Sequence, residues 1–396
     1  MLFYRYSAFR DLIVLAAVLL TLSLLALALW LYLICGRGFF WRLGPFLPPS
    51  VNTGEWPPVV AVVAARDEAE VISRSLGSLR RQQYSGRFAI ILVDDKSLDA
   101  TAELARGVAS GNGPRVEIIA GEPPPPAWTG KLWALTQGAE RANRLVPDAR
   151  YIWFTDADIE HDSGILRDLV SKAETGNLDL VSTMVRLHCT SPWERLLIPA
   201  FIFFFQKLYP FRLVNDPRRR IAAAAGGSML VRAPSLRGAG GLTAIRGELI
   251  DDCALARLIK KNGPIWLGLT GRSLCIRGYG LADIWRMVAR SAYTQLRHSP
   301  IQLAATSAVM MLLYFVPVAA LAWGCASSHY ACALAGGATW ILMASVYRPM
   351  MRLYGQASLA SLFLPAAAFL FTIMTLDSAR RHWQGKGGMW KGRARP

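Results

Sequence analysis

The chain has 396 residues, of which 53% are hydrophobic and 18% are charged, with a mean hydropathy of +0.29. This composition excludes a disordered chain, because disordered segments are poor in apolar residues. Lys and Arg number 44 against 27 Asp and Glu, so the formal net charge is +17. Such an excess suits a nucleic acid, an anionic membrane surface or a phosphorylated substrate. The distribution of residues along the chain must decide among these partners.

Two long stretches contain no Asp, Glu, Lys or Arg: residues 12–35 over 24 positions and residues 301–347 over 47 positions. A membrane-spanning helix needs about 20 mainly apolar residues. The first stretch therefore predicts one helix, and the second predicts two helices that turn near residues 327–329. Residues 353–376 are a further uncharged candidate. Because the first stretch exceeds the apolar core of a secretory signal peptide and no A-x-A-like site ends it, we expect an uncleaved anchor.

The six cysteines show no spacing typical of a disulfide framework or a zinc site. Three lie in or beside apolar stretches and three are scattered without a C-x-x-C pair; they are Cys35, Cys325, Cys332, Cys189, Cys253 and Cys275. We expect the part of the chain between the apolar stretches to lie in a reducing cytoplasm.

Between the anchor and the C-terminal apolar block, apolar runs alternate with helical stretches after a Pro- and Gly-rich segment at residues 44–58. The predicted strands are 59–65, 88–93, 116–120 and 151–154, and the predicted helices are 69–83, 98–110 and 131–146. Continuous apolar runs separated by helices indicate a parallel sheet covered on both faces, the doubly wound α/β arrangement. Ligands of such sheets bind beyond the carboxyl ends of the strands.

Polar residues follow the first, second and fourth predicted strands at these ends. They are Arg66, Asp67 and Glu68, then Asp94 and Asp95, then Asp156 and Asp158. A D-x-D pair suits Mg²⁺ or Mn²⁺, which takes one or two carboxylates and completes its shell with water and phosphate oxygens. The Asp94–Asp95 pair suits a nucleobase edge or ribose hydroxyls. The same residue types are also common in solvated turns and helix caps.

Three further positions carry residues suited to ligand binding or catalysis, and each also has a purely structural explanation. Lys131 starts a predicted helix, where its charge and the helix N-terminus would meet a phosphate, or it is a surface lysine. Gly226 and Gly227 would let the backbone approach a ligand closely, or they serve packing. Asp251 and Asp252 begin another helical stretch, so one suits a helix cap and the other suits a general base.

Six motifs occur in an order that resembles the membrane-bound family 2 glycosyltransferases with a GT-A fold. They lie between residues 57 and 263 and are VVAVVAARDEAE, ILVDDKSLDAT, WTGKLWAL, FTDADIEHD, AAGGSMLV and LIDDCALARLIKKNG. The whole chain, including the C-terminal GMWKGR, looks most like the bacterial hopene-associated glycosyltransferases. The resemblance implies an α/β GT-A domain, Rossmann-like and built for nucleotide-diphospho-sugars, with an N-terminal anchor and C-terminal membrane helices.

The resemblance also implies roles for individual residues. A nucleotide sugar, expected to be a UDP-sugar, would be bound by Ala64, Arg66, Glu68, Asp95, Lys131 and Asp156. The divalent metal, Mg²⁺ or Mn²⁺, would be held by Asp156 and Asp158. The base of an inverting transfer would be Asp252, although the usual Glu before it is replaced by Asp251, which leaves either acid available. The acceptor or diphosphate side would include Gly226, Gly227, Arg290 and Arg297.

Two related activities are disfavoured by missing features. The Q-x-x-R-W motif of processive family members has no tryptophan in the corresponding segment 290–298, so a processive polysaccharide synthase is not expected. A nucleotidyltransferase would carry a Gly-rich loop after the first strand, and ARDEAE contains no glycine.

We therefore expect transfer of a sugar to a hydroxyl of a membrane lipid, in hopanoid biosynthesis, without a nucleic acid partner. One alternative is another lipid acceptor, such as a carotenoid, a ceramide-like lipid or a polyprenyl phosphate. The other alternative is a non-catalytic lipid-binding membrane protein.

Charges beside the apolar stretches predict the arrangement across a bacterial cytoplasmic membrane. Basic flanks at Arg37, Arg42 and Arg286 place the intervening region in the cytoplasm. The expected parts are an anchor at 1–43, a cytoplasmic GT-A domain at 44–300, membrane helices at 301–379 and a basic tail at 380–396. Three full spans after residue 300 would put that tail outside, so we expect one re-entrant or interfacial segment.

One aromatic segment inside the expected cytoplasmic domain has two interpretations. Residues 193–211 carry charges near both ends and Pro199 in the interior. This pattern favours either a helix in the headgroup plane, which would guide a lipid acceptor, or a buried core helix.

Overall fold

The computed structural model describes residues 2–51, 54–111 and 113–387. The chain forms two compact units. The first unit comprises Met1–Leu43, Cys189–Pro210 and Gly280–Arg381, and the second comprises Gly44–His188, Phe211–Tyr279 and His382–Pro396. This division assigns residues 189–210 and 280–300 to the same unit as the apolar helices, whereas the sequence analysis expected them in a 44–300 domain.

The second unit is built on an eight-stranded sheet with the order β3-β2-β1-β4-β7-β6-β8-β5. Its first half consists of the predicted strands, which are β1 (Val59–Ala65), β2 (Phe88–Asp94), β3 (Arg115–Ala120) and β4 (Tyr151–Asp156). These strands pair in parallel. Every residue of β1 is buried, as its continuous apolar sequence requires of a strand covered on both faces. The predicted strands and their parallel pairing are confirmed.

Beyond β4, where the sequence analysis predicted no strands, the sheet is mixed. β7 (Ser228–Arg232) runs antiparallel to both β4 and β6 (Leu180–Arg186). β8 (Ile265–Cys275) is parallel to β6, and β5 (Ile159–His161) is antiparallel to β8. Because β7 starts opposite the end of β4, with Ser228 paired to Thr155, its entering segment lies next to the carboxyl end of β4.

Of the three predicted helices of the second unit, two are shorter than predicted and the third, α4, has the predicted length, shifted by one residue. The helices of this unit are α2 (Ile72–Arg80), α3 (Thr101–Ala109), α4 (Gly130–Leu145), α5 (Ile165–Thr175), α7 (Phe211–Val214), α8 (Ala233–Gly238) and α9 (Asp251–Lys260), with a 3₁₀ turn η1 (Leu242–Ile245). The late start of α2 and α3 has a local cause, because the loops before them bond to each other. Asp67 N donates to Ser97 Oγ at 3.0 Å, and Leu98 N donates to Asp67 Oδ1 at 2.8 Å.

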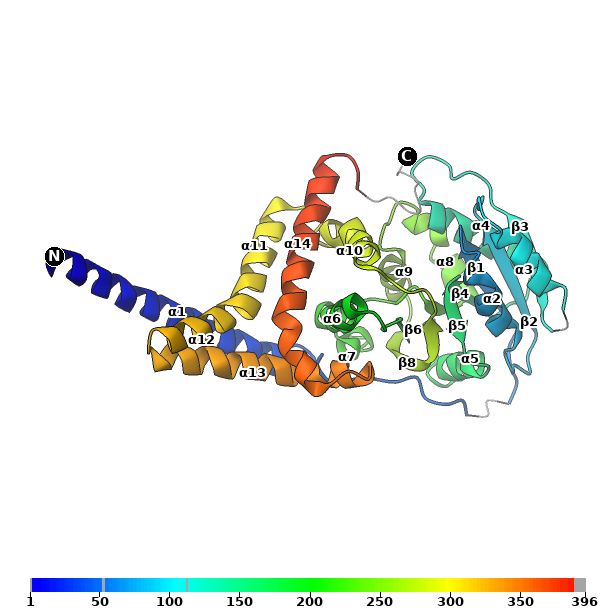
Figure 1. Ribbon diagram of the computed structural model, residues 1–396. Helices are drawn as coiled ribbons and strands as arrows, with labels where there is room; N and C mark the ends of the chain where they lie inside the picture. The colour runs from blue at the N-terminus through cyan, green and yellow to red at the C-terminus, as the bar shows by residue number, and fades with distance from the viewer. Residues whose placement is uncertain (1, 52–53, 112, 388–396) are drawn as a thin grey trace. The chain divides into compact units, whose positions relative to one another are not determined.

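The first unit consists of helices. They are α1 (Leu2–Gly36), α6 (Pro192–Leu208), α10 (Leu281–Gln295), α11 (Pro300–Met310), the π-helical turn η2 (Met311–Phe315), α12 (Val316–Ala326), α13 (Tyr330–Leu353), the 3₁₀ turn η3 (Ser358–Phe363) and α14 (Leu364–Trp383). α12 and α13 lie side by side (Figure 1). The turn between them falls at residues 327–329, as predicted.

Four helical segments among the described residues are long and apolar enough to cross a membrane. They are Arg10–Gly36, Pro300–Ala326, Tyr330–Leu353 and Ser358–Trp383. These segments correspond to the anchor and the C-terminal membrane helices that the sequence predicted.

α6 covers most of the aromatic segment 193–211, for which the sequence predicted either a helix in the headgroup plane or a buried core helix. It begins with a capping box between Ser191 and Glu194. Within its unit, Phe203 packs against Tyr347 with ring centroids 5.1 Å apart, and Phe204 packs against Phe371 at 5.2 Å. One face of α6 is therefore part of the helical core of the first unit.

Candidate active site

The carboxyl end of β4 carries a lysine surrounded by carboxylates. Lys131, in the first turn of α4, has its Nζ 2.7 Å from Asp156 Oδ1 and 3.6 Å from Asp251 Oδ2. Asp251 Oδ2 is buried and accepts no hydrogen bond in the described part of the chain. The structure thus brings together residues that are far apart in the sequence, at the sheet edge where ligands of α/β folds bind.

Asp252 is fixed by the main chain that leads into β7. Its Oδ2 accepts a hydrogen bond from Gly226 N at 3.0 Å, and its Oδ1 accepts one from Cys253 N at 2.6 Å. A Cβ added at Gly226 would lie 3.4 Å from Lys131 Nζ, 3.6 Å from Asp252 Oδ2 and 3.8 Å from Asp156 Oδ2. Gly226 therefore lies between the lysine and two of the acids, and a side chain there would fill that space.

The neighbouring Gly227 has a structural role that explains its identity. A Cβ at this position would come within 2.9 Å of Val185 Cγ2, and its carbonyl oxygen accepts a hydrogen bond from Thr155 Oγ1 at 2.9 Å. Thr155 also contacts the buried His161, whose Nε2 is 2.8 Å from its hydroxyl. Close packing against Val185 therefore explains why residue 227 is a glycine.

Asp158 lies in the turn between β4 and β5 and contacts the end of β8. Its Oδ2 is 3.5 Å from Arg277 Nε and 3.6 Å from Cys275 Sγ. Arg277 Nη2 also forms an ion pair with Glu68 Oε2. Arg277 thus joins two predicted site residues, Glu68 and Asp158. The sequence analysis missed it, and the available signal was a basic residue two positions after the end of β8.

Arg66, Asp95 and Ala64 lie at the ends of β1 and β2. Arg66 Nη1 donates to the Asp95 carbonyl oxygen at 2.8 Å and lies 3.5 Å from its Oδ2. Ala64 pairs in register with Asp156 of β4 on one side and with Val93 of β2 on the other. These predicted residues line the same sheet edge as the carboxylates.

Arg290 lies on α10 and Arg297 follows that helix, so both belong to the first unit. The geometry of the second unit does not include them, and their assignment to a diphosphate stays a prediction.

Two of the carboxyl groups are costly to ionise. Burial, together with the charge of Asp156, raises the pKa of Asp158 to about 6. Burial and the charge of Asp251 raise the pKa of Asp252 to about 6, against the opposing effect of Lys131. The pKa of Lys131 is itself raised by Asp156 and Asp251, which outweigh its burial. The acids therefore outnumber the cations that stabilise them, and a further positive charge would favour their ionised forms.

This excess of negative charge fits a divalent cation shared with a phosphate ligand. No group of three or more His, Cys, Asp or Glu side chains suited to a metal ion occurs within the described ranges. Mg²⁺ and Mn²⁺ need fewer protein ligands than that, because one or two carboxylates suffice when substrate phosphates and water complete the shell. Asp156 and Asp158 can supply these carboxylates.

The sequence of the sheet domain matches a known family. Residues 60–238 match the model of the family described as Glycosyl transferase family 2. This part of the chain is therefore similar to the family 2 glycosyltransferases. This match spans β1 to α8 and includes the ends of β1, β2 and β4 described above.

Comparison with solved structures supports the fold. A mannosyltransferase from Pyrobaculum calidifontis, solved in complex with GDP-Man and Mn²⁺, is 15% identical with a TM-score of 0.53, over 95% of this chain and 100% of that chain. Glucosyl-3-phosphoglycerate synthase from Mycobacterium tuberculosis, solved with Mn²⁺, UDP-glucose and phosphoglyceric acid, is 20% identical with a TM-score of 0.42, over 63% of this chain and 84% of that chain. None of the curated proteins matches this chain. At 15% identity the likeness to the mannosyltransferase concerns the fold alone, and it agrees with the expected GT-A arrangement.

Proposed function

We propose that the chain is a membrane-bound, inverting glycosyltransferase that moves a sugar from a nucleotide sugar to a hydroxyl of a membrane lipid. The observation that carries the proposal is the group of Asp156, Asp158, Asp251 and Asp252 around Lys131 at the carboxyl edge of a family 2 domain. The mannosyltransferase of similar fold was solved with a nucleotide sugar and Mn²⁺, which supports the same ligand class here.

The donor would be bound along the ends of β1, β2 and β4. Arg66, Glu68 and Asp95 suit the nucleoside, since their side chains are largely buried and held by one another and by neighbouring loops. Lys131 suits the diphosphate, because it combines a positive charge with the first turn of α4. A divalent metal at Asp156 and Asp158 would stabilise the charge of the departing diphosphate.

Asp252 would accept the proton of the acceptor hydroxyl as that hydroxyl attacks the anomeric carbon in line with the leaving diphosphate. A pKa of about 6 leaves the carboxylate largely ionised at neutral pH and close to the range in which a general base is most effective. The two main-chain hydrogen bonds from Gly226 and Cys253 hold it in place. Asp251 would instead position Lys131, which lies 3.6 Å from its Oδ2.

The lipid acceptor is supported by the four apolar helices of the first unit. A hopanoid acceptor rests on the resemblance of the whole chain to the hopene-associated enzymes, and the alternative is a carotenoid, ceramide-like or polyprenyl phosphate acceptor. We propose that the sugar transfer takes place at the cytoplasmic side of a bacterial inner membrane, where nucleotide sugars occur.

The proposal is tested with the full chain purified in detergent and supplied with a panel of nucleotide sugars, Mg²⁺ or Mn²⁺, and total bacterial lipid. We expect release of a nucleoside diphosphate together with a labelled lipid, which mass spectrometry then identifies. A labelled non-hopanoid lipid would overturn the hopanoid assignment. No turnover and no binding of any nucleotide sugar would overturn the enzyme assignment in favour of a non-catalytic membrane role.

A further inference from the structure

The last turns of α14 hold a nearly buried carboxylate between two arginines. Asp377 Oδ1 accepts hydrogen bonds from Arg380 Nε at 2.9 Å and Nη2 at 2.6 Å, and its Oδ2 accepts one from Arg381 Nε at 2.7 Å. Trp285 of α10 donates its Nε1–H to the same Oδ2 at 2.9 Å. The Asp377 side chain is 11% exposed, whereas those of Arg380 and Arg381 are 62% and 36% exposed. The carboxylate therefore orients two guanidinium groups that remain accessible.

The charge of this cluster is only partly compensated. Asp377 is the one acid paired with either arginine among the described residues, so two cations share one anion. Each guanidinium has five N–H donors, and the bonds to Asp377 use two from Arg380 and one from Arg381. The remaining donors suit an anion with several oxygens, such as a phosphate.

A shallow cavity of about 460 Å³, open to the surface, lies at this cluster. Its wall consists of Trp285, Ile373, Leu376 and the three charged residues. The wall residues of α14 have the spacing of a single helix face. Along that face the wall is aliphatic at Ile373 and Leu376 and cationic at the end of the apolar segment Ser358–Trp383. The cavity thus changes from apolar to basic over two turns of one helix.

The two helices that form the cavity are held together next to it. Tyr293 N of α10 donates to Ser378 Oγ of α14 at 3.0 Å. Tyr293 also packs with Leu303 and Ala379 in one buried cluster. The wall is therefore built by packed elements of a single unit.

We propose that this cavity binds the headgroup of an anionic phospholipid of the surrounding bilayer. The phosphodiester would lie against Arg380 and Arg381, and the glycerol and first acyl carbons would lie against Ile373 and Leu376. The end of a membrane-spanning segment is where headgroups lie, and tryptophan and basic side chains favour that level of the bilayer. The proposal requires the first unit to lie in a membrane, and it is independent of the sugar transfer.

The test measures lipid retained by the full chain in a non-ionic detergent containing equal amounts of phosphatidylglycerol and phosphatidylcholine, with native mass spectrometry as the readout. We expect phosphatidylglycerol to be retained in preference to phosphatidylcholine. The double variant Arg380→Gln/Arg381→Gln is expected to retain about tenfold less phosphatidylglycerol. The matched control Arg286→Gln/Arg348→Gln removes two exposed arginines that are not part of the cavity wall and is expected to behave as the unaltered chain.

Equal retention of the two lipids, or an equal loss in both double variants, would overturn the proposal. Displacement of the lipid by inorganic phosphate at the lipid's own concentration would also overturn it, because the site would then select a small anion. If the first double variant does not fold, Leu376→Glu places a carboxylate at an exposed position of the wall and is expected to give the same loss. Sugar transfer assayed in the same samples reports separately on the proposed enzyme activity.

Discussion

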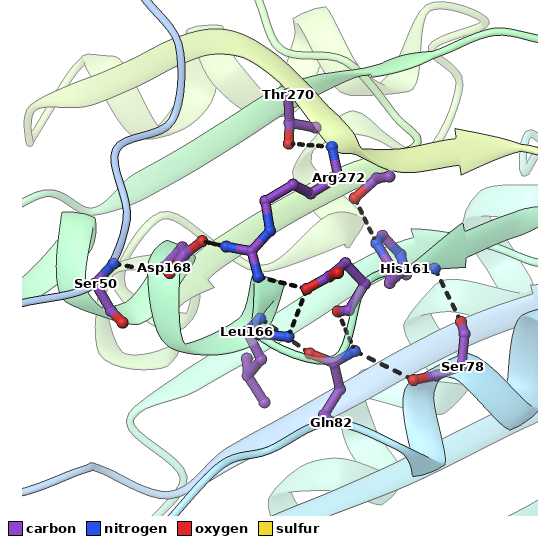
Figure 2. A network of polar contacts seen from close by, with 11 residues as sticks. Ser50, Ser78, Gln82, His161, Leu166, Asp168, Thr270 and Arg272 are labelled. Carbon is purple, nitrogen blue, oxygen red and sulfur yellow. Dashed lines mark hydrogen bonds and ion pairs between the residues drawn. The ribbon is translucent and has the colours of Figure 1, made fainter.

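Two polar regions of the second unit, both formed around strands of the same sheet, differ in how their charges are balanced. Figure 2 shows the first region, where Arg272 reaches Asp168 and Gln82 connects Ser78 to Leu166. Burial lowers the pKa of His161 to about 3, so this residue is neutral. Hydrogen bonds from Gly164 N and Arg272 lower the pKa of Asp162, so its carboxylate is stabilised by the fold.

The region around Lys131 shows the opposite balance. The pKa values of Asp158 and Asp252 are raised to about 6, because burial and neighbouring carboxylates disfavour their charges. A network that stabilises its own charges supports the structure, whereas a group of acids that outnumbers its cations is suited to receive a further cation with a ligand. The presence of polar residues therefore does not distinguish a ligand-binding site from a structural network, whereas the balance of their charges does.

The largest expected effect comes from Asp252→Asn, which removes the proposed base while keeping the shape of the side chain. We expect transfer to fall by about 10³-fold, a typical loss for a general base. The measurement is the initial rate of nucleoside diphosphate release with lipid present. Asp251→Asn serves as the matched variant, and a larger loss there than in Asp252→Asn would reverse the assignment of the base.

The next effect concerns the proposed metal ligands. Asp158→Asn removes one of two carboxylates, so we expect transfer to fall by about 10²-fold and the Mn²⁺ concentration for half-maximal rate to rise. A titration of rate against Mn²⁺ measures both changes. An unchanged rate and an unchanged metal requirement would show that Asp158 does not hold the metal.

Substitution of a residue in the structural network of Figure 2 should change the stability of the fold and leave the rate of sugar transfer intact. Arg272→Gln removes the ion pair with the nearly buried Asp168, so we expect the free energy of unfolding to decrease by about 2 kcal/mol. Thermal unfolding in detergent measures this loss, while turnover per folded molecule should stay constant. Arg74→Gln breaks an exposed pair with Glu160 and should cost less than about 1 kcal/mol.

The smallest effect is a pH dependence of the reaction. Because the pKa of Asp252 is raised to about 6, we expect kcat/KM to fall about tenfold for each pH unit below 6 and to level off above 7. The same shift makes the ionised carboxylate unfavourable in the fold, so its contribution to stability decreases as pH rises from about 4 to 6. Rates between pH 5 and 8 test this, and a rate that stays constant down to pH 5 would contradict the raised pKa.

Much of the fold follows from local sequence patterns. The continuous apolar runs identify β1 to β4, and the uncharged stretches identify the membrane-spanning candidates, because burial on both faces and bilayer thickness each impose a recognisable composition. The antiparallel β7 was not predictable in this way. Its direction depends on where the chain re-enters the sheet, which no local pattern records.

The candidate site was predictable in part for the same reason. Residues at strand ends, such as Asp156 and Asp158, are expected to converge because parallel strands end at one edge. Arg277 was missed, because its approach to Glu68 and Asp158 depends on β8 joining the second half of the sheet. The raised pKa values also depend on burial and on neighbours distant in sequence.

The central claim is that the acids around Lys131 receive a nucleotide sugar together with a divalent cation. Equilibrium binding of a panel of nucleotide sugars, with and without Mn²⁺, tests it most directly in the unaltered chain, in Asp158→Asn and in Asp162→Asn. We predict binding that requires Mn²⁺, is weakened in Asp158→Asn and is retained in Asp162→Asn. Binding that is independent of Mn²⁺ and equal in all three proteins would contradict the claim.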